Sequence, residues 1–299
     1  MDSIPVIDTH QHLWDLDLFQ LPWLDLPGMD VLRTSFRMAD YREATQNCPI
    51  AKSVYMEVNV HPDLQRQEAQ YVLTLCEAED NPMSGAVIGG CPAESSFASY
   101  LEEFADNPFV KGVRTILHDP DRPRGMCLTP QFKENIRLLG DRGLSFDLCM
   151  RPAEIQDAVE LVDACPETRF IIDHCGNMSV QPDQQQDRSD WEQGMQRMAD
   201  CDHVFCKISG IIATATRGAW QPEDLKQNIN FCLDTFGEDR VFFGGDWPVC
   251  TLTANFESWY QALKWIVQDR PETFQRKLFH DNAAAFYRLG ASKKCQRLC

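Results

Sequence analysis

Two histidines separated by one residue lie near the start of the chain, in the segment VIDTHQHLWD at positions 6–15. If this segment is a strand, its side chains alternate, so His10 and His12 point to the same side. Imidazole nitrogens are common ligands of Zn²⁺ and of neighbouring divalent ions. An ion held with one open position lowers the pKa of its bound water and makes a nucleophile near neutral pH. With suitable partners elsewhere, the pair would support hydrolysis of a carbonyl compound.

Two later segments supply such partners. The segment FIIDHCG at 170–176 contains His174, and VFFGGDWP at 241–248 contains Asp246. A carboxylate beside the attacking water can accept its proton and pass it to the leaving group. We predict that Asp246 and His174 are catalytic and that His10 and His12 bind a metal. Two alternatives are that the two histidines are ordinary polar residues at the end of a strand, and that Asp246 only caps a following helix. Asp173 is expected to be structural and to point away from its neighbour His174, because side chains alternate along a strand.

Three charged residues in apolar surroundings extend this candidate site. Glu57 lies in YMEVNV, where an unpaired carboxylate would be costly to bury, so it should meet a metal or a cation. An ion pair with Arg114 or Lys207 is the alternative to metal ligation. We predict that Arg114 and Lys207 bind substrate, and the guanidinium of Arg114 offers paired donors to a carbonyl or carboxylate. Pairing with Glu57 is the other role open to both.

The remaining candidate substrate contacts are a histidine and three tryptophans. His118 follows a predicted strand and is expected in a loop near the ligand, with a plain surface position as the alternative. Indole rings can stack on the face of a sugar ring or pack beneath a loop. The tryptophans predicted to stack on substrate are Trp14, Trp23 and Trp247.

Short β-rich runs alternate with amphipathic stretches of helical period along the whole chain. The eight predicted strands are 6–9, 53–58, 83–88, 112–116, 144–148, 169–173, 204–208 and 240–243. The predicted helices are 65–79, 97–104, 130–139, 153–164, 190–199, 223–236 and 256–267. This order favours an α/β protein with parallel strands in a (β/α)₈ TIM barrel. The alternative, an open doubly wound sheet, would want a glycine-rich phosphate loop, and the sequence has none of the usual form.

A long connection follows the first predicted strand. Residues 16–43 contain tryptophan, phenylalanine and two prolines, which is too much for a short βα loop. Long structured loops at the carboxyl end of barrel strands commonly cover the active site. Because chemistry in a barrel lies at that end, the candidate residues above are the ones that eight converging strands would bring together.

The four motifs VIDTHQHLWD, GVR at 112–114, IDHCG at 172–176 and FGGDWP at 243–248 resemble the amidohydrolase superfamily. More narrowly, they resemble its lactonase branch, which includes L-fuconolactonase, L-rhamnonolactonase and pyrone-dicarboxylate lactonase. The similarity runs from about Ile4 to the closing stretch 282–287. It implies a (β/α)₈ hydrolase that opens the lactone of a sugar acid or of an aromatic-degradation product.

The resemblance also implies roles for particular residues. His10, His12 and His174 correspond to histidine positions of the family, and Asp246 corresponds to the aspartate that handles the water. The fourth and fifth strands offer Arg114 and a segment without histidine, where dinuclear members carry further ligands, so two metals are not expected. The branch contains members with one zinc and members that work without metal. The expectation is therefore one divalent ion, preferably Zn²⁺, or none.

Composition excludes several classes of protein. The chain has 299 residues, a net charge of −17 and no basic patch, so no nucleic-acid partner is expected. No apolar run approaches the length of a membrane span. The 13 cysteines include no CxxC pair, and no signal peptide is evident, which predicts reduced thiols in a cytoplasmic protein. We expect one domain over residues 1–290 and a polar tail at 291–299. A homo-oligomer is compatible with the sequence, which sets no oligomeric state.

Two other functions stay open. A metal-dependent decarboxylase of the same superfamily would release CO₂, and its relatives look less like FGGDWP. A non-catalytic barrel that binds a metabolite would hold its ligand without turnover. A small-molecule lactone is the substrate that the motifs favour.

Overall fold

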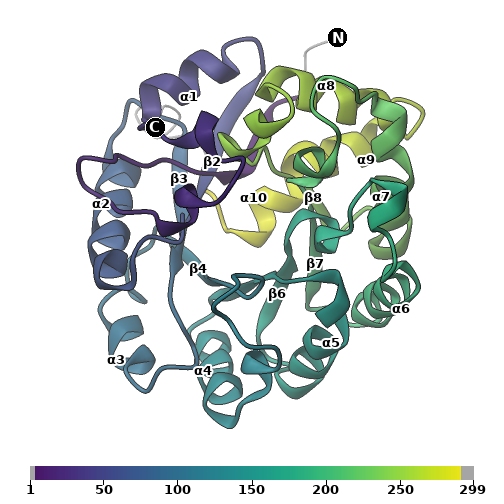
Figure 1. The fold of residues 1–299 in the computed structure, drawn as a ribbon. Helices are drawn as coiled ribbons and strands as arrows, with labels where there is room; N and C mark the ends of the chain where they lie inside the picture. The colour runs from purple at the N-terminus through teal and green to yellow at the C-terminus, as the bar shows by residue number, and fades with distance from the viewer. Residues whose placement is uncertain (1–3, 291–299) are drawn as a thin grey trace.

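Eight parallel strands form one sheet in sequential order, β1 to β8, in the computed structural model, which describes residues 4–290 (Figure 1). Asp246 N donates to His10 O at 2.8 Å and His12 N donates to Trp247 O at 2.8 Å, which joins the last strand to the first. The (β/α)₈ prediction is confirmed, and each predicted strand overlaps an observed one. The strands are β1 Val6–Gln11, β2 Ile50–Met56, β3 Met83–Gly89, β4 Val110–Ile116, β5 Ser145–Cys149, β6 Arg169–Ile172, β7 Val204–Ile208 and β8 Val241–Phe243.

Helices surround the barrel (Figure 1). Their apolar stripes are buried against it. Thr129 Oγ1 accepts a hydrogen bond from Phe132 N at 3.4 Å and so caps the helix that begins at Pro130. All seven predicted helices are present. They are α2 Gln65–Glu77, α3 Phe97–Glu102, α4 Pro130–Asp141, α5 Ile155–Ala164, α6 Arg188–Ala199, α7 Pro222–Phe236 and α8 Phe256–Ile266, and the chain adds α1 Met38–Thr45, α9 Glu272–Arg276 and α10 Asn282–Phe286.

Helix α1 begins inside the segment 16–43, which the sequence predicted to be a long loop, and ends two residues beyond it. It is short and buries only Tyr41 and Thr45, so it lacks the apolar period that marks the other helices. Its start is fixed by a side chain, since Asp40 Oδ2 accepts a hydrogen bond from Arg37 N at 2.7 Å. The rest of the long first loop is ordered by backbone pairing between Trp14 and Phe36, with N···O distances of 2.9 and 2.8 Å.

The barrel interior has an apolar end and a charged end. At the end where the strands begin, Ile7, Val54, Val87, Ile171 and Phe242 pack together. Phe286 and Tyr287, at the end of α10, belong to the same cluster and cover the end of the barrel where the strands begin. Toward the carboxyl ends of the strands the buried side chains are charged instead. This layering is typical of the fold and places the polar groups at the end that carries chemistry.

No helix within residues 4–290 is long and apolar enough to cross a membrane. The eleven cysteines in this part of the chain are all free thiols, and most are buried. The predicted tail at 291–299 lies outside the described residues.

Candidate active site

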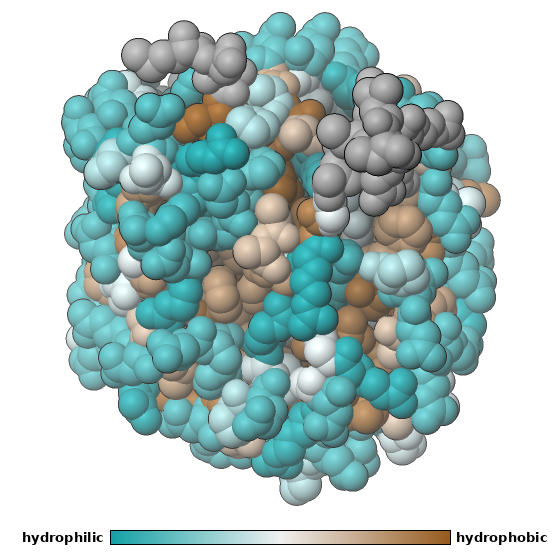
Figure 2. All heavy atoms as spheres, turned by 180° about the vertical axis from the view of Figure 1, so that it is seen from behind, coloured by the Kyte–Doolittle hydropathy of each residue, from teal (hydrophilic) through white to brown (hydrophobic). Residues whose placement is uncertain are grey.

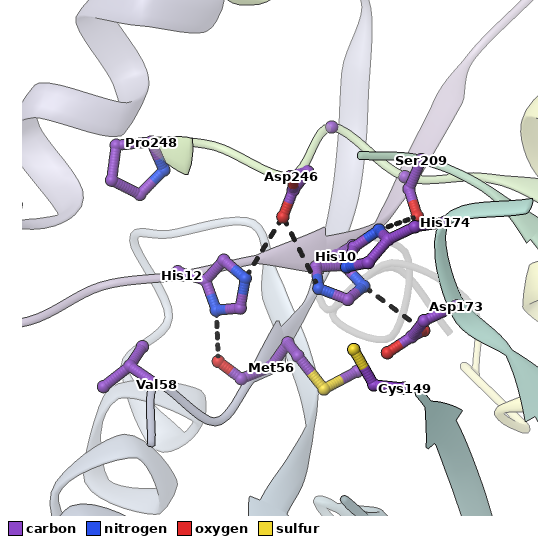
Figure 3. A network of polar contacts seen from close by, with 12 residues as sticks. His10, His12, Met56, Val58, Cys149, Asp173, His174, Ser209, Asp246 and Pro248 are labelled. Carbon is purple, nitrogen blue, oxygen red and sulfur yellow. Dashed lines mark hydrogen bonds and ion pairs between the residues drawn. The ribbon is translucent and has the colours of Figure 1, made fainter. Parts of the chain in front are cut away.

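Asp246 lies between the two histidines of the first strand. Its Oδ1 is 3.3 Å from His12 Nε2 and 3.6 Å from His10 Nε2 (Figure 3). His10 and His12 therefore face the same side, as alternation predicted. His12 Nδ1 lies 2.9 Å from the carbonyl oxygen of Met56, which can only accept, so Nδ1 carries the proton. The unprotonated Nε2 of a neutral His12 then faces the Asp246 carboxylate, an arrangement that requires a cation or a proton between them.

The GGD sequence before Asp246 is explained by close approach of the backbone. A Cβ on Gly244 would lie 2.8 Å from His10 Cβ and 2.9 Å from Ser209 Cβ. A Cβ on Gly245 would lie 2.2 Å from the ring of Phe256. Only glycine allows the chain to bring Asp246 this near to His10. Asp246 itself has a left-handed φ of 54°, which turns its side chain inward as the strand ends.

His174 joins this group from the turn that follows β6. Its φ is 54°, so the chain leaves the strand geometry immediately after Asp173. The two imidazole rings of His10 and His174 lie with centroids 4.5 Å apart, and Ser209 Oγ lies 2.9 Å from His174 Nδ1 (Figure 3). One ligand atom from each of His10, His174 and Asp246 falls within 4.8 Å of the others. Three residues far apart in sequence thus converge on one point.

A buried ion network lies behind His10. Lys207 Nζ donates to Asp147 Oδ2 at 2.8 Å, forms an ion pair with Asp173 Oδ1 at 2.9 Å, and lies 3.2 Å from His10 Nδ1. Arg114 Nη1 lies 3.2 Å from Asp173 Oδ2 and 3.1 Å from His10 Nε2. Each ring nitrogen of His10 is therefore placed beside a cation and a carboxylate, which fixes the orientation of the ring.

Burial and charge shift the pKa values of this network in different directions. Burial lowers the pKa of His10 well below its ordinary value, so the ring is neutral at neutral pH. Burial raises the pKa of Asp147 to about 7, although Lys207 opposes the shift. Burial would also raise the pKa of Asp173, but Lys207 and His10 outweigh it and hold that pKa well below its usual range. Asp173 is thus the anion that balances the two cations.

The residues present fit a single divalent cation. His10 and His174 offer imidazole nitrogens and Asp246 offers a carboxylate oxygen, a donor set suited to Zn²⁺. His12 presents its lone-pair nitrogen to the same carboxylate and is oriented by a backbone carbonyl, as metal-binding histidines usually are. A second cluster of Cys149, Asp173 and His174 is less suited. Burial raises the pKa of the Cys149 thiol to about 12, and Asp173 is already paired with Lys207.

Several predicted site residues have structural partners. Glu57 Oε1 accepts from Arg114 Nε at 2.6 Å and Oε2 accepts from Asn59 N at 2.7 Å, so both oxygens are engaged and Glu57 lies outside the converging group. Arg114 and Lys207 are buried, and both pair with acidic side chains behind His10. The sequence had left this pairing open as the alternative.

The predicted substrate contacts at the mouth divide into two groups. His118 is exposed, with Nδ1 3.5 Å from Cys149 Sγ, and can reach a ligand. Trp23 is half-buried and donates to Val58 O at 2.7 Å. Trp14 and Trp247 are buried and pack edge-on against Phe36, which leaves no free ring face for a sugar. Their role in this structure is to hold the first loop on the barrel.

Sequence reasoning missed Asp147 and misjudged Asp173. Asp173 was expected to point away from His174, because neighbours in a strand alternate. Strand β6 ends at Ile172, and the left-handed turn at His174 lets both side chains face the site. The one sequence signal for Asp147 is that it is an acidic residue inside the apolar run LSFDLCM. A carboxylate buried in such a run must pair with a cation. That signal would have paired it with Lys207.

Comparison with known proteins identifies the family of this chain. The model of the amidohydrolase family matches residues 7–289, so the chain belongs to this family. This confirms the predicted superfamily. An L-fucono-1,5-lactonase from Burkholderia multivorans is 26% identical over 95% of this chain and 96% of its own length.

Two solved structures share the barrel fold of this chain. A zinc-bound amidohydrolase from Burkholderia multivorans has a TM-score of 0.85 at 21% identity, covering 96% of this chain and all of its own. The 5-carboxyvanillate decarboxylase of Sphingomonas paucimobilis has a TM-score of 0.65 at 12% identity, covering 96% of this chain and all of its own. At these identities the likeness concerns the barrel fold, which hydrolases and decarboxylases share.

Proposed function

We propose that the protein hydrolyses the lactone of a sugar acid, of the L-fuconolactone or L-rhamnonolactone type, to the open acid. The observation that carries this proposal is the Asp246 carboxylate, which is held between His10 and His12 at the end of β8. The relative named as an L-fucono-1,5-lactonase supports the choice of substrate class. Free cysteines among residues 4–290 are compatible with action on a small metabolite in the cytoplasm.

In the proposed reaction Asp246 accepts a proton from a water molecule as the water oxygen attacks the lactone carbonyl carbon. The tetrahedral intermediate then collapses with cleavage of the bond to the ring oxygen. Asp246 returns the proton to that oxygen, which leaves as the hydroxyl of the product. Arg114 and Lys207 hold His10 in place and take no part in proton transfer.

His10, His12, His174 and Asp246 are the residues that would hold a divalent ion. Such an ion supplies Lewis-acid polarisation of the carbonyl and a lower pKa for water. The zinc bound by a solved amidohydrolase of the same fold supports a divalent ion as the cofactor. His118 and the half-buried Trp23 are the residues that we propose contact the sugar ring from the mouth of the barrel.

The test is proton release, followed with a pH indicator, on a panel of lactones. The panel holds five- and six-membered aldonolactones, including the L-fucono and L-rhamnono types, and a pyrone dicarboxylate. Asp246→Asn protein is the matched blank that corrects for spontaneous hydrolysis. Turnover of one sugar lactone by the wild-type protein alone is expected.

Turnover of the pyrone but of no sugar lactone would replace the sugar acid by an aromatic-derived substrate. Silence across the panel from folded protein would overturn the proposal. In that case, release of CO₂ from carboxylated aromatic acids would identify a decarboxylase, and binding without turnover would identify a non-catalytic barrel.

A further inference from the structure

A hollow lies at the end of the barrel where the strands begin, opposite the candidate active site. It has a volume of about 310 Å³ and is bounded by the segment before β4, the turn before β5, the start of β6 and residues 286–288 after α10. Figure 2 views the molecule from behind, and hydrophilic side chains stand beside a hydrophobic area in the middle of that face. Nothing in the proposed reaction uses this end of the barrel.

Four of the residues that line the hollow are basic: Lys111, Arg142, Arg169 and Arg288. Asp106 is the one acidic residue among those lining it. Within residues 4–290 none of the four cations forms an ion pair. In a chain whose net charge is −17, acidic partners are abundant, and most other arginines are paired with one. The concentration of unpaired positive charge here is therefore local and specific.

Arg169 is held rigidly at the floor of the hollow. Its Nη1 donates to Phe286 O at 2.7 Å and its Nη2 donates to Gly143 O at 2.9 Å. The guanidinium also lies 4.4 Å from the centre of the Phe286 ring. These contacts use only part of its donor capacity, because a guanidinium has five N–H groups. A preorganised cation of this kind loses little entropy when it binds an anion.

The other three cations line the same hollow, and none of them has an acidic partner among the described residues. Lys111 Nζ donates to Pro108 O at 2.7 Å, which leaves two ammonium protons free. Burial lowers the pKa of Lys111, and the charges of Arg288 and Lys52 lower it further. Burial and Arg288 lower the pKa of Arg169 in the same way. Arg142 and Arg288 are exposed at the rim, with guanidinium groups free to turn inward.

We propose that this hollow binds a small organic anion that carries two or more phosphate or carboxylate groups. Arginine forks bind both groups in a bidentate manner, and an anion would relieve the repulsion of Arg288 with Lys111 and Arg169. The apolar wall formed by Leu144, Phe286 and Tyr287 favours a ligand with a short carbon skeleton over a bare inorganic ion. The volume suits a metabolite of a few carbons with its charged groups at the rim and floor. The inference is independent of the reaction at the other end.

The experiment is isothermal titration of the full chain at low ionic strength with citrate and, separately, with pyrophosphate. Acetate at equal ionic strength is the monovalent control. We expect citrate or pyrophosphate to bind one per chain and acetate not to bind detectably. In the double variant Arg142→Gln/Arg288→Gln the affinity should fall at least about tenfold, because two charge-assisted contacts are lost. Both side chains are exposed, so the variant should fold.

The matched control is Lys226→Gln/Lys264→Gln, which removes the same charge from exposed positions on α7 and α8. It should keep the wild-type affinity. An equal loss in both variants would show a general charge effect and overturn the proposal. Unchanged binding in Arg142→Gln/Arg288→Gln, or no binding of either polyanion to the wild-type protein, would overturn it as well. The ratio of the two wild-type affinities distinguishes carboxylate from phosphate recognition.

Discussion

Lys207 Nζ lies 2.9 Å from Asp173 Oδ1, and both side chains are completely buried inside the barrel. Asp147 is the second anion on the same ammonium, at 2.8 Å, and His10 lies 3.2 Å away on its third side. Two carboxylates and an imidazole nitrogen surround this ammonium, which is completely buried. The position of His10, which faces Asp246, therefore depends on an ion cluster inside the barrel.

Replacing Lys207 by Met should lower the free energy of unfolding by about 3–5 kcal/mol, because two buried carboxylates lose their partner. Urea denaturation followed by circular dichroism measures this loss. The double variant Lys207→Met/Asp147→Asn should recover part of the stability, since one uncompensated charge is removed as well. Unchanged stability in the single variant would mean that the cluster is not formed in solution.

Asp246→Asn should lower kcat by about 10²–10⁴-fold, the usual contribution of a general base, and leave the melting temperature within a few degrees. The measurement is proton release on whichever lactone the wild-type protein turns over. Asp269→Asn, at an exposed position far along the chain, is the control for loss of one carboxylate and should keep full activity. Full activity in the Asp246 variant would contradict the proposed proton transfer.

Zn²⁺ should raise the melting temperature of chelator-treated wild-type protein, since an ion that binds only the folded state adds about 2.7 kcal/mol at 100 times its Kd. His12→Ala/His174→Ala should lose this response. His61→Ala, which removes a partly exposed histidine beside Asp63, should keep it. The same thermal response in all three proteins would place the ion elsewhere, and no response in the wild-type protein would identify a metal-independent member.

Glu68 should make the protein less stable as pH rises. It is buried, and burial together with the nearby Glu57 raises its pKa to about 8. A raised pKa means that the folded state favours the neutral acid, so its contribution is complete below about pH 4.5 and is lost as pH rises through 8. Between pH 5 and 8 the wild-type protein should lose about 2–4 kcal/mol relative to Glu68→Gln.

The measurement is urea denaturation of both proteins at several pH values. Glu134→Gln, an exposed change on α4, should follow the wild-type curve. Parallel curves for the wild-type protein and Glu68→Gln would mean that Glu68 is ionised in the folded state across this range. Its hydrogen bonds from Val58 N and Tyr55 Oη would then outweigh burial.

Local patterns in the sequence were sufficient to predict the barrel and the candidate residues at the carboxyl ends of its strands. Alternating strand and helix periods depend on neighbours a few positions apart, so the strands were found within about three residues. Helix α1 was not predicted, because it buries too few residues to show a helical period of apolar side chains. His10, His12 and Asp246 were found because each stands just past an apolar run, where barrel chemistry lies.

The tertiary structure alone decided which charged groups meet. Arg114, Asp147, Asp173 and Lys207 come from four different strands or strand ends, and their contact depends on the register and inward direction of each. The left-handed backbone at His174 cancelled the alternation on which the prediction for Asp173 relied. The sequence by itself therefore determined the fold, the family and the candidate catalytic groups. Only the folded barrel determined that Arg114 and Lys207 support His10, because long-range ion pairs leave no periodic trace along the chain.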